Sequence, residues 1–571
     1  MVREASFLKA LFLGVIPEEL AFPYPELSVE ERENTRMILE SVRDWASRAV
    51  DAGAIDRAAK IPPEVLQGLR ELGLFGTSIP REHGGGGLSA TASARVLQEV
   101  AGIDGSLGLT LSAHLVLGTR GLLLYGTRAQ QERYLHRMAT GECIAAYALT
   151  EPGAGSDAAS LQTRAEAVGD GYTLQGQKVW VANGGLAELF TVFARTTPPG
   201  ASHRPKITAF LVERGPGVRA GPELPRLGLR GASATSVTLD GVRVPAEAML
   251  GEHSRGFKVA MEVLNAGRLN LAACALGSAR RLVRLAVARL QERRAFGRPI
   301  GEFGLLKDKV AMMMADTFAM ESMTYLTTGL VDARVPDTSL ESACCKVFAS
   351  EACWRVAHEA LQVAAGSGYL QDQPFERMLR DARANHIFEG TNEILRAFIA
   401  LAGMQGPARK ITAVSGALRE PIKGFGLLSD VALRRARSAL GRDRMNRAHP
   451  TLRREVVVLE EHVELLARSV EKVLRKHGKD IAEMQYTQRR VADIAVDLYA
   501  LTACVARTTR AIERRGEAGA QREIDLTAAF ANSARLRLEA NARAFDSNDD
   551  ELRKGIASRA YADGGYTFDV V

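Results

Sequence analysis

Apolar positions change their spacing along the chain, and these changes predict its elements. In residues 28–137 apolar side chains recur every three or four positions, which predicts amphipathic helices. Ser28 followed by Glu31 has the form of a capping box at the start of the first helix. The glycine-rich run 83–87 lacks the spacing of a phosphate-binding loop, so we expect a flexible connection there.

From about residue 143 to 244 the spacing becomes that of strands. Short runs rich in β-branched and aromatic residues are separated by Gly and Pro, at 172–174, 179–181, 190–194 and 207–212. Asp240 and Gly241 separate two more such runs, which predicts a β-hairpin with a two-residue turn.

A helical pattern returns at Gly256 and continues to about residue 403, with many Ala and few helix breakers. After a looser segment from about residue 410, two further apolar stripes begin at Val456 and Val491, and each predicts a helix with one buried face. The order helices, strands, helices predicts a β domain between two helical domains, the second of which is a bundle.

Composition sets broad bounds on this 571-residue chain. The length exceeds what one core supports, so we expect several domains. The formal charge of +7 allows anionic partners without selecting one. The six Cys form no CxxC pair and have no zinc-like spacing with His, so neither a metal site nor a disulfide framework is indicated. No apolar run reaches membrane-spanning length and the N-terminal segment lacks a cleavage site, so we expect a cytoplasmic protein.

The stretch 385–396, NHIFEGTNEILR, contains the strongest candidate for chemistry. An apolar run precedes Glu389, and Gly390 then interrupts it before a new helical pattern for which Thr391 or Asn392 is a good N-cap. A carboxylate held among apolar residues becomes more basic, which suits a general base. For a single Glu, a solvated surface charge is the more common role.

A second stretch, AYALTEPGAGSD at 146–157, changes that balance. Together the two motifs resemble those of the acyl-CoA dehydrogenase flavoproteins, whose catalytic base is the acid before Gly-Thr. The resemblance covers nearly the whole chain and is closest to the very-long-chain branch, whose Phe-Pro-Tyr-Pro is matched at 22–25. It implies a mainly α fold with a central β domain. In order, we expect an N-terminal helical domain (1–142), a β-barrel-like domain (143–255), a C-terminal four-helix bundle carrying the base (256–405) and an additional helical domain (406–571).

The resemblance implies FAD as the cofactor, bound partly across a homodimer interface. The matching flavin positions are Tyr147, Ala148, Leu149, Thr150, Ser156, Trp180, Val181 and Ala182. Positions that match cross-subunit FAD contacts are Arg293, Phe296, Gln362, Val363, Ala364, Ala365 and Gly366. The ADP part of FAD corresponds to Thr391, Asn392 and Glu393, where a helix N-terminus can receive a diphosphate.

The resemblance also implies a substrate site. Its positions are Ser156, Asn265, Ala266, Gly267, Arg268, Phe388 and Gly390. Some family members carry their base immediately before the Arg; here that position is Gly267, which leaves Glu389 as the candidate. Gly108 and Ser112 match positions that close the acyl pocket when they are large. Both are small, so we expect a long-chain substrate, although small residues also permit close helix packing.

Two positions depart from the family pattern. Ala182 replaces a Thr or Ser whose hydroxyl approaches flavin N5, and Ala295 replaces a common Gln or Thr beside Phe296. An alanine side chain cannot donate a hydrogen bond. At Ala182 we therefore expect a change in flavin potential and reoxidation but not in FAD binding, and at Ala295 the loss of one cross-subunit hydrogen bond to FAD.

The resemblance predicts α,β-dehydrogenation of long-chain acyl-CoA, with Glu389 as the base and electron-transfer flavoprotein as the acceptor. Two alternatives remain open: an acyl-CoA oxidase that uses O2, and a scaffold protein that retains the fold. Yellow colour and peroxide production would discriminate among them. The basic pI does not indicate nucleic acid, since no binding module is recognisable.

Eight Arg and two acids stand between residues 431 and 455, beside several apolar residues. Such a segment suits an anionic membrane surface. The segment 421–455 therefore predicts peripheral contact with the inner face of the membrane, and a solvated or internally paired charge cluster is the alternative.

Overall fold

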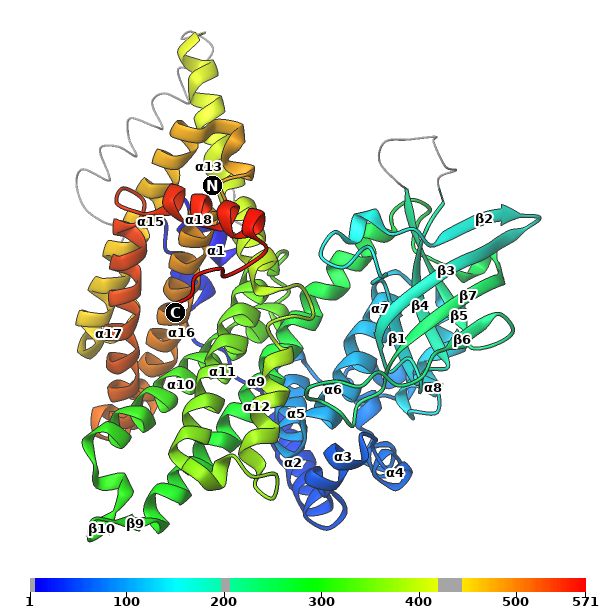
Figure 1. The fold of residues 1–571 in the computed structure, drawn as a ribbon, viewed down its shortest axis with the longest axis horizontal. Coiled ribbons are helices and arrows are strands. Elements are labelled where there is room, and N and C mark those ends of the chain that lie inside the picture. The colour runs from blue at the N-terminus through cyan, green and yellow to red at the C-terminus, as the bar shows by residue number, and fades with distance from the viewer. Residues whose placement is uncertain (1–5, 197–205, 420–443, 571) are drawn as a thin grey trace. The chain divides into compact units, whose positions relative to one another are not determined.

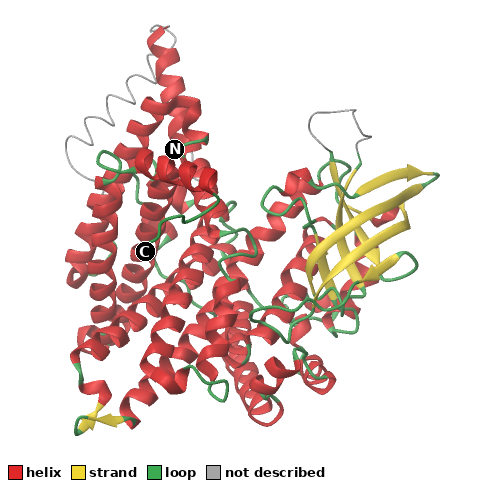
Figure 2. Cartoon of the chain, viewed as in Figure 1, coloured by secondary structure: helices red, strands yellow, loops and turns green. Residues whose placement is uncertain are grey.

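The computed structural model describes residues 6–196, 206–419 and 444–570. They form two compact units: Leu20–Leu395, and a second unit that joins Met1–Glu19 to Arg396–Val571. Helices predominate, and the strands are concentrated in one region of the first unit (Figures 1 and 2). The mainly α fold with a central β domain is confirmed, whereas the domain boundaries stay predictions.

The N-terminal helices of the first unit form where the spacing predicted them. They are α2 (Val29–Ala49), α3 (Ala52–Ala58), α4 (Pro63–Glu71), α5 (Ala90–Ile103), α6 (Gly105–Ser112), α7 (Arg120–Tyr125) and α8 (Arg128–Ala139). Ser28 caps α2 by accepting from the N–H of Glu31 at 3.1 Å. The Glu31 carboxylate accepts from the N–H of Ser89 at 2.8 Å, so it serves the start of α5 rather than completing the predicted box.

The run 83–87 is a connection, as predicted, but its backbone is tied down. The N–H of Gly86 donates to Gly76 O and that of Gly87 to Ile79 O, both at 2.9 Å.

The sheet contains eight strands whose main path runs β6–β7–β3–β2–β4–β5–β8, and β1 pairs in parallel with β4. The strands are β1 (Ala145–Ala148), β2 (Arg164–Val168), β3 (Gly171–Ala182), β4 (Leu189–Arg195), β5 (Ile207–Glu213), β6 (Val218–Ala220), β7 (Ala234–Pro245) and β8 (Met249–Leu250). Strands β4 and β5 are buried on both faces, because Phe190 and Phe210 lie in one core while Phe193 and Leu211 pack into another. Burial on both faces explains their continuous apolar runs.

The hairpin predicted at Asp240 and Gly241 is wrong. β7 continues through both residues: Leu174 pairs with Val242 and Gly176 with Leu239, so Asp240 and Gly241 together face the single residue Gln175. The pair forms a β-bulge, with Gly241 at φ +64° and its N–H bonded to Gln175 Oε1 at 2.8 Å. A bulge of this kind needs the same left-handed glycine as the expected turn, which is why the sequence signal misled.

The helical return at Gly256 is confirmed. The helices are α9 (Gly256–Glu292), α10 (Gly304–Asp332), α11 (Ser339–Gly368), α12 (Pro374–Ala384) and α13 (Asn392–Arg419), with a two-stranded hairpin of β9 (Arg294–Ala295) and β10 (Arg298–Pro299) between α9 and α10. α9 packs against α5, α10 and α11, and its first turns pack under the sheet. This helix therefore joins the helical and β parts of the unit at one place.

In the second unit, the two predicted stripes are the buried faces of α15 (Arg453–His477) and α16 (Gln485–Gly519), which pack with α17 (Gln521–Arg543). α1 (Phe7–Leu11) packs on α15 and α16, and α18 (Asp550–Asp563) follows α17. Most of the basic segment 421–455 lies outside the described residues. Within its described part, Arg453 pairs with Glu460 at 3.2 Å.

Among the described residues, one helical stretch, Gly105–Tyr125, is long and apolar enough to cross a membrane, but 72% of it is buried in the fold. This degree of burial identifies the stretch as part of the core of the first unit.

Candidate active site

Glu389 stands in a strained turn between α12 and α13. Its φ is +60° and that of Gly390 is +91°. A non-glycine residue in this conformation costs free energy, so the surroundings must hold it in place. Thr391 caps α13 by accepting from the N–H of Ile394 at 3.3 Å, which confirms the predicted cap.

The carboxyl group of Glu389 is enclosed and lacks a donor. Oε2 is buried and no hydrogen-bond partner reaches it among the described residues. Burial raises the pKa of Glu389 to about 7, although the charges of Arg268 and Lys346 act in the opposite direction. An enclosed carboxyl with a pKa near 7 can take up a proton at neutral pH, which is what a general base requires.

Gly267 of α9 makes room for this carboxylate. A Cβ atom at Gly267 would lie 2.4 Å from Glu389 Oε2, which is closer than atoms pack. The next residue, Arg268, donates from Nε to the backbone O of Glu389 at 3.4 Å and from Nη1 to Asn265 Oδ1 at 2.7 Å. The structure therefore brings the predicted substrate segment of α9 onto the predicted base.

Tyr147 of β1 faces the same group from the sheet. Its hydroxyl donates to Ala260 O of α9 at 3.2 Å. Burial and then the nearby Glu389 charge hold the pKa of Tyr147 well above its usual value, so it stays neutral.

A narrow cavity extends from Glu389 between α5, α6, α9 and α12. Most of its walls are apolar or small, and it is lined by Ala101, Gly105, Leu109, Ser112, Leu229, Leu271, Cys274, Ser278, Asp381, Ala382, Asn385, Phe388 and Glu389. The apolar character of these walls suits a hydrocarbon chain that ends at the base, but the cavity volume of about 30 Å³ means that the walls must part before such a chain can enter. Ser112 lies in this lining. Gly108 does not: a Cβ there would lie 2.7 Å from Ala101 Cβ, so Gly108 serves the contact between α5 and α6.

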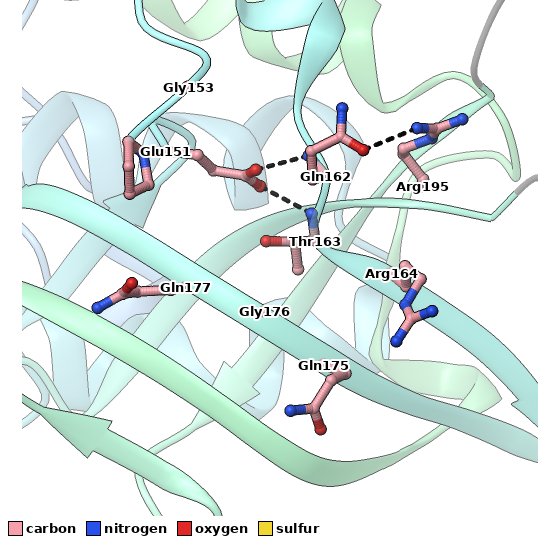
Figure 3. A pocket seen from close by; sticks show the side chains of 10 residues that line it. Glu151, Gly153, Gln162, Thr163, Arg164, Gln175, Gly176, Gln177 and Arg195 are labelled. Carbon is pink, nitrogen blue, oxygen red and sulfur yellow. Dashed lines mark hydrogen bonds between the residues drawn. The ribbon is translucent and has the colours of Figure 1, made fainter. Parts of the chain in front are cut away.

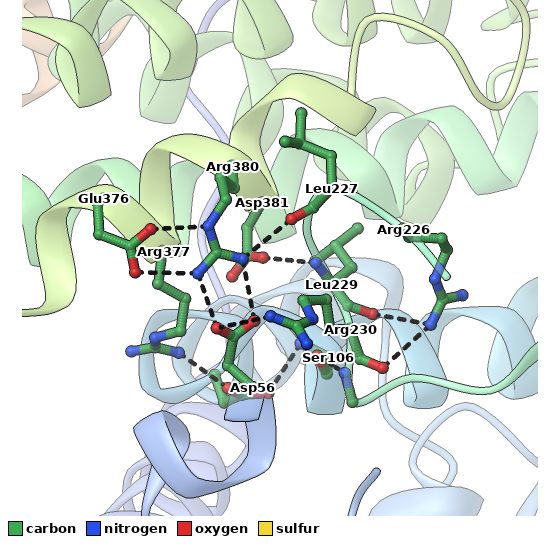
Figure 4. A network of polar contacts seen from close by, with 12 residues as sticks. Asp56, Ser106, Arg226, Leu227, Leu229, Arg230, Glu376, Arg377, Arg380 and Asp381 are labelled. Atoms are coloured by element: carbon green, nitrogen blue, oxygen red, sulfur yellow. Dashed lines mark hydrogen bonds and ion pairs between the residues drawn. The ribbon is translucent and has the colours of Figure 1, made fainter. Parts of the chain in front are cut away.

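A buried network of charges fixes α12, the helix that leads into the base (Figure 4). Arg377 pairs with Asp104 at 3.0 Å and Arg380 pairs with Asp56 at 2.7 Å. Asp381, which also lines the cavity, accepts from the N–H of Leu229 at 2.5 Å. α12 is thereby tied to α3, to the N-cap of α6 and to the segment that precedes β7.

The two motifs predicted to hold the flavin lie side by side. The N–H of Val179 donates to Thr150 O at 2.9 Å, which places the segment 147–150 against the end of β3. Lys178 strengthens this contact, since its fully buried Nζ donates to Leu149 O, Phe193 O and Glu151 Oε1 at 3.1, 2.7 and 2.7 Å.

Trp180, two residues after Lys178, has a φ of +55°, and the residue is 66% exposed. A strained backbone that presents an indole ring beside backbone polar groups fits a planar, polar-edged ring system such as that of FAD. Val181 is buried, Ala182 pairs with Ala234 at the end of the strand, and Ser156 is exposed on the loop that follows Thr150.

The cross-subunit positions lie largely at the surface of the single chain. Arg293 ends α9, and Phe296 is 93% exposed in the β9–β10 turn, where its ring meets Phe303 at 5.9 Å. In α11 the helix breaks at Ala365, which has a φ of +53°. Gln362, Ala365 and Gly366 are exposed, and Val363 and Ala364 are buried. These positions stay predictions, because one chain does not bring them to the flavin segments.

A second cavity, of about 570 Å³, lies against β2 and β3 and shares no lining residue with the first (Figure 3). Its polar lining is Glu151, Gln162, Thr163, Arg164, Gln175, Gln177 and Arg195. The Thr163 hydroxyl is buried without a partner among the described residues. Since Glu151 is neutralised by Lys178, the two Arg give this cavity a positive lining.

Sequence reasoning missed three residues that the structure places at the site. Lys346 of α11 and Asp381 of α12 border the base and its cavity, and Lys178 holds the flavin segment. Lys346 had a detectable signal, because it is the one charge in an otherwise apolar helical stretch, SACCKVFAS.

Comparisons with known proteins agree with this geometry. Family models described as the N-terminal, middle and C-terminal domains of acyl-CoA dehydrogenase match residues 32–142, 146–242 and 254–404, and one described as the ACAD9/ACADV C-terminal domain matches 450–566. The mitochondrial very-long-chain specific acyl-CoA dehydrogenases of Macaca fascicularis and Homo sapiens are 40% and 39% identical over 566 residues, which is 97% of this chain and 86% of theirs. A probable acyl-CoA dehydrogenase, FadE10, of Mycobacterium tuberculosis is 34% identical over 99% of this chain and 89% of its own.

Solved structures give the same result. An acyl-CoA dehydrogenase complexed with FAD from Bacillus anthracis superposes with a TM-score of 0.81 at 30% identity, over 96% of this chain and 94% of the other. Butyryl-CoA dehydrogenase from Megasphaera elsdenii gives 0.63 at 32% identity, over 66% of this chain and 99% of its own.

Proposed function

Because this chain belongs to the acyl-CoA dehydrogenase family, we propose that it uses FAD to convert long-chain acyl-CoA thioesters to trans-2-enoyl-CoA. The observation that carries the proposal is the enclosed, unpartnered carboxylate of Glu389 at the end of an apolar cavity. A purely structural glutamate would have been paired at this depth.

The residues of the chain divide the work. Glu389 Oε2 takes the proton from C2 of the thioester, while Arg268 and the strained turn keep the carboxylate aimed at that carbon. FAD, when bound at 147–150 and 180–182, supplies the acceptor for the hydride from C3. The cavity walls exclude water from the carboxylate, which preserves its basicity.

The proposed long-chain preference rests on the small side chain of Ser112 in the cavity lining. A series of acyl-CoA lengths assayed with an artificial electron acceptor tests it, and we expect a maximum at long chains. Ser112→Leu should move that maximum toward shorter chains. Ser112→Ala is the matched control, since it changes the same position in the cavity lining without adding volume. An unchanged maximum in Ser112→Leu would mean that other residues set the depth.

The polar cavity supports a site for the phosphate-bearing end of CoA. It begins at Glu151, on the loop that carries Ser156, and Arg164 and Arg195 supply positive charge. Arg164→Gln with Arg195→Gln should raise KM for acyl-CoA severalfold. The same variant should leave KM unchanged for the matching acyl-pantetheine, which lacks the nucleotide, and an equal change for both substrates would contradict this placement.

An acyl-CoA oxidase is the second candidate, because Ala182 lacks a hydroxyl at the end of β3. A peroxide assay in air, run beside the acceptor assay, discriminates the two, and Ala182→Thr should then suppress any peroxide.

We further propose electron-transfer flavoprotein as the electron acceptor. We also propose a homodimer with FAD at its interface, which the exposed side chain of Phe296 supports. A cytoplasmic location with peripheral contact to the inner face of the membrane through 421–455 stays a proposal. Salt-sensitive sedimentation with anionic, but not neutral, vesicles would support the contact.

A further inference from the structure

Lys346 is a fully buried lysine whose two acceptors both belong to the base turn. It lies on α11, and its side chain is 0% exposed. Nζ donates to Gly390 O at 2.7 Å and to Asn392 Oδ1 at 2.8 Å. A lysine enclosed at this depth costs desolvation, so its retention calls for a specific reason.

The bonds span the strained part of the turn. Glu389 and Gly390 both have left-handed backbones, and the Lys346 bonds reach residues on the α13 side of Glu389. Asn392 is itself fixed, because its Nδ2 donates to Ser350 Oγ at 3.0 Å and to Glu351 Oε1 at 3.1 Å, and its N–H donates to His386 O at 3.1 Å. α11 therefore holds the turn at Gly390 and Asn392, whereas Arg268 holds it at the backbone O of Glu389.

Lys346 also acts on Glu389 through charge. The titratable and charged groups that face the pair are Arg268 and Cys274 from α9, Glu351 from α11, Glu393 from α13, Tyr147 from β1 and His386 from the segment after α12. Burial lowers the pKa of Lys346 to about 7, and the Glu389 charge opposes that shift. In return, the Lys346 charge acts to lower the pKa of Glu389 against the effect of burial.

We propose that Lys346 is a positioning residue for proton abstraction: it anchors the Glu389–Gly390 turn to α11 and gives the base carboxylate a compensating positive charge. This rests on the function proposed above, in which Glu389 removes the proton from C2.

The test separates proton abstraction from oxidation. A long-chain acyl-CoA with two methyl groups on C3 has no hydrogen there to lose as hydride, yet its C2 hydrogens can still exchange with D2O at the base. We would measure that exchange by mass spectrometry against pH in the FAD-loaded enzyme, together with turnover of an ordinary long-chain acyl-CoA. Lys346→Met removes both the charge and the donors, and Lys346→Gln removes the charge but keeps two N–H donors.

The exchange rate should rise with pH as Glu389 ionises and then reach a plateau. Without the Lys346 charge the pKa of Glu389 rises, so the rising limb should move to higher pH in both variants. In Lys346→Met the plateau should also fall by about tenfold or more, because the turn is no longer held. Lys346→Gln should retain more of the plateau, and Lys472→Met, which removes a lysine from an exposed ion pair, should match the wild type.

The proposal would be overturned if, in Lys346→Met, the rising limb stayed at the wild-type pH and the plateau exchange rate stayed within twofold of the wild-type rate. Loss of FAD or of thermal stability in both variants with an unshifted limb in the remaining holoenzyme would also overturn it, since that pattern belongs to a purely structural lysine. Absence of exchange in the wild type would instead reject Glu389 as the base, and the proposed function with it.

Discussion

Glu151 and Glu389 are enclosed carboxyl groups of the same unit, but only Glu151 is paired. Glu151 accepts from Lys178 Nζ at 2.7 Å and from the N–H groups of Gln162 and Thr163 at 2.5 and 3.0 Å. Burial alone would raise the pKa of Glu151, yet these donors outweigh burial and hold it below its usual value. For Glu389 burial prevails, because no donor reaches Oε2 among the described residues and the pKa rises to about 7.

The difference teaches that burial and local donors together decide what a buried glutamate does. The Glu151–Lys178 pair is held by backbone groups of β4 and of the segments that follow β1 and precede β2, so it fixes the segment proposed to hold the flavin. Glu389 is held by its backbone, through Arg268 and Lys346, and its carboxylate stays available. The proposed site thus combines a rigid side, where we place the cofactor, with a side on which the carboxylate of the proposed base stays free to react.

The largest expected effect breaks the reactive side. Glu389→Gln is nearly isosteric but cannot accept a proton usefully, so turnover should fall by about a thousandfold or more. FAD content, read from the visible spectrum, should stay at the wild-type level. Normal reduction of the flavin by substrate in this variant would rule out Glu389 as the base.

Loss of the Lys178–Glu151 pair on the rigid side should lower the free energy of unfolding. Lys178→Met leaves Glu151 buried without its cation, and loss of one partner of a buried pair costs about 3–5 kcal/mol of unfolding free energy. Calorimetry should show a lower Tm and a weaker hold on FAD. The double variant Lys178→Met with Glu151→Gln should recover part of the loss, and no recovery would mean that the pair itself is not the cause.

Gly267→Ala tests the space around the base without touching its charge. The new Cβ would meet Glu389 Oε2 at 2.4 Å, so the carboxylate must move. A displacement of this size should lower kcat by about a hundredfold while FAD remains bound. Alanine is a better helix former than glycine, so helix propensity favours this change and cannot account for a loss of kcat. A kcat within twofold of the wild type would mean that the carboxylate moves aside without loss of function.

The smallest effect contrasts the two glutamates directly. A carboxyl whose folded pKa lies above its unfolded value destabilises the fold once the pH exceeds the unfolded pKa, and the cost is complete above the folded pKa. At pH 8, therefore, Glu389→Gln should stabilise the protein by about 1 kcal/mol or more, and below pH 4 the gain should vanish. Glu151→Gln should destabilise at pH 8, because its folded pKa is lowered. Shifts of the same sign in urea unfolding would refute the contrast.

The sequence sufficed where a local pattern determines the outcome. Spacing predicted the helices on both sides of the sheet, and Thr391 was found as a cap. The apolar setting expected for Glu389 is also observed, whereas its role as the base stays a prediction. It failed where one local signal serves two structures, as at Gly241, where a left-handed glycine forms a bulge instead of a turn. It was also blind to contacts between distant segments, such as Lys346 with Gly390 and Asp381 with Leu229, since no spacing rule relates them.

The close approach of Gly267 to Glu389 constrains how this site can evolve. A base at either position would occupy the same volume, so an acid at 267 cannot coexist with the present carboxylate. Moving the base from one segment to the other needs two substitutions: either one made first crowds the site or leaves it without a base. Each residue thus fixes the other's identity, and the two locations of the base form separate fitness peaks that single mutations do not connect.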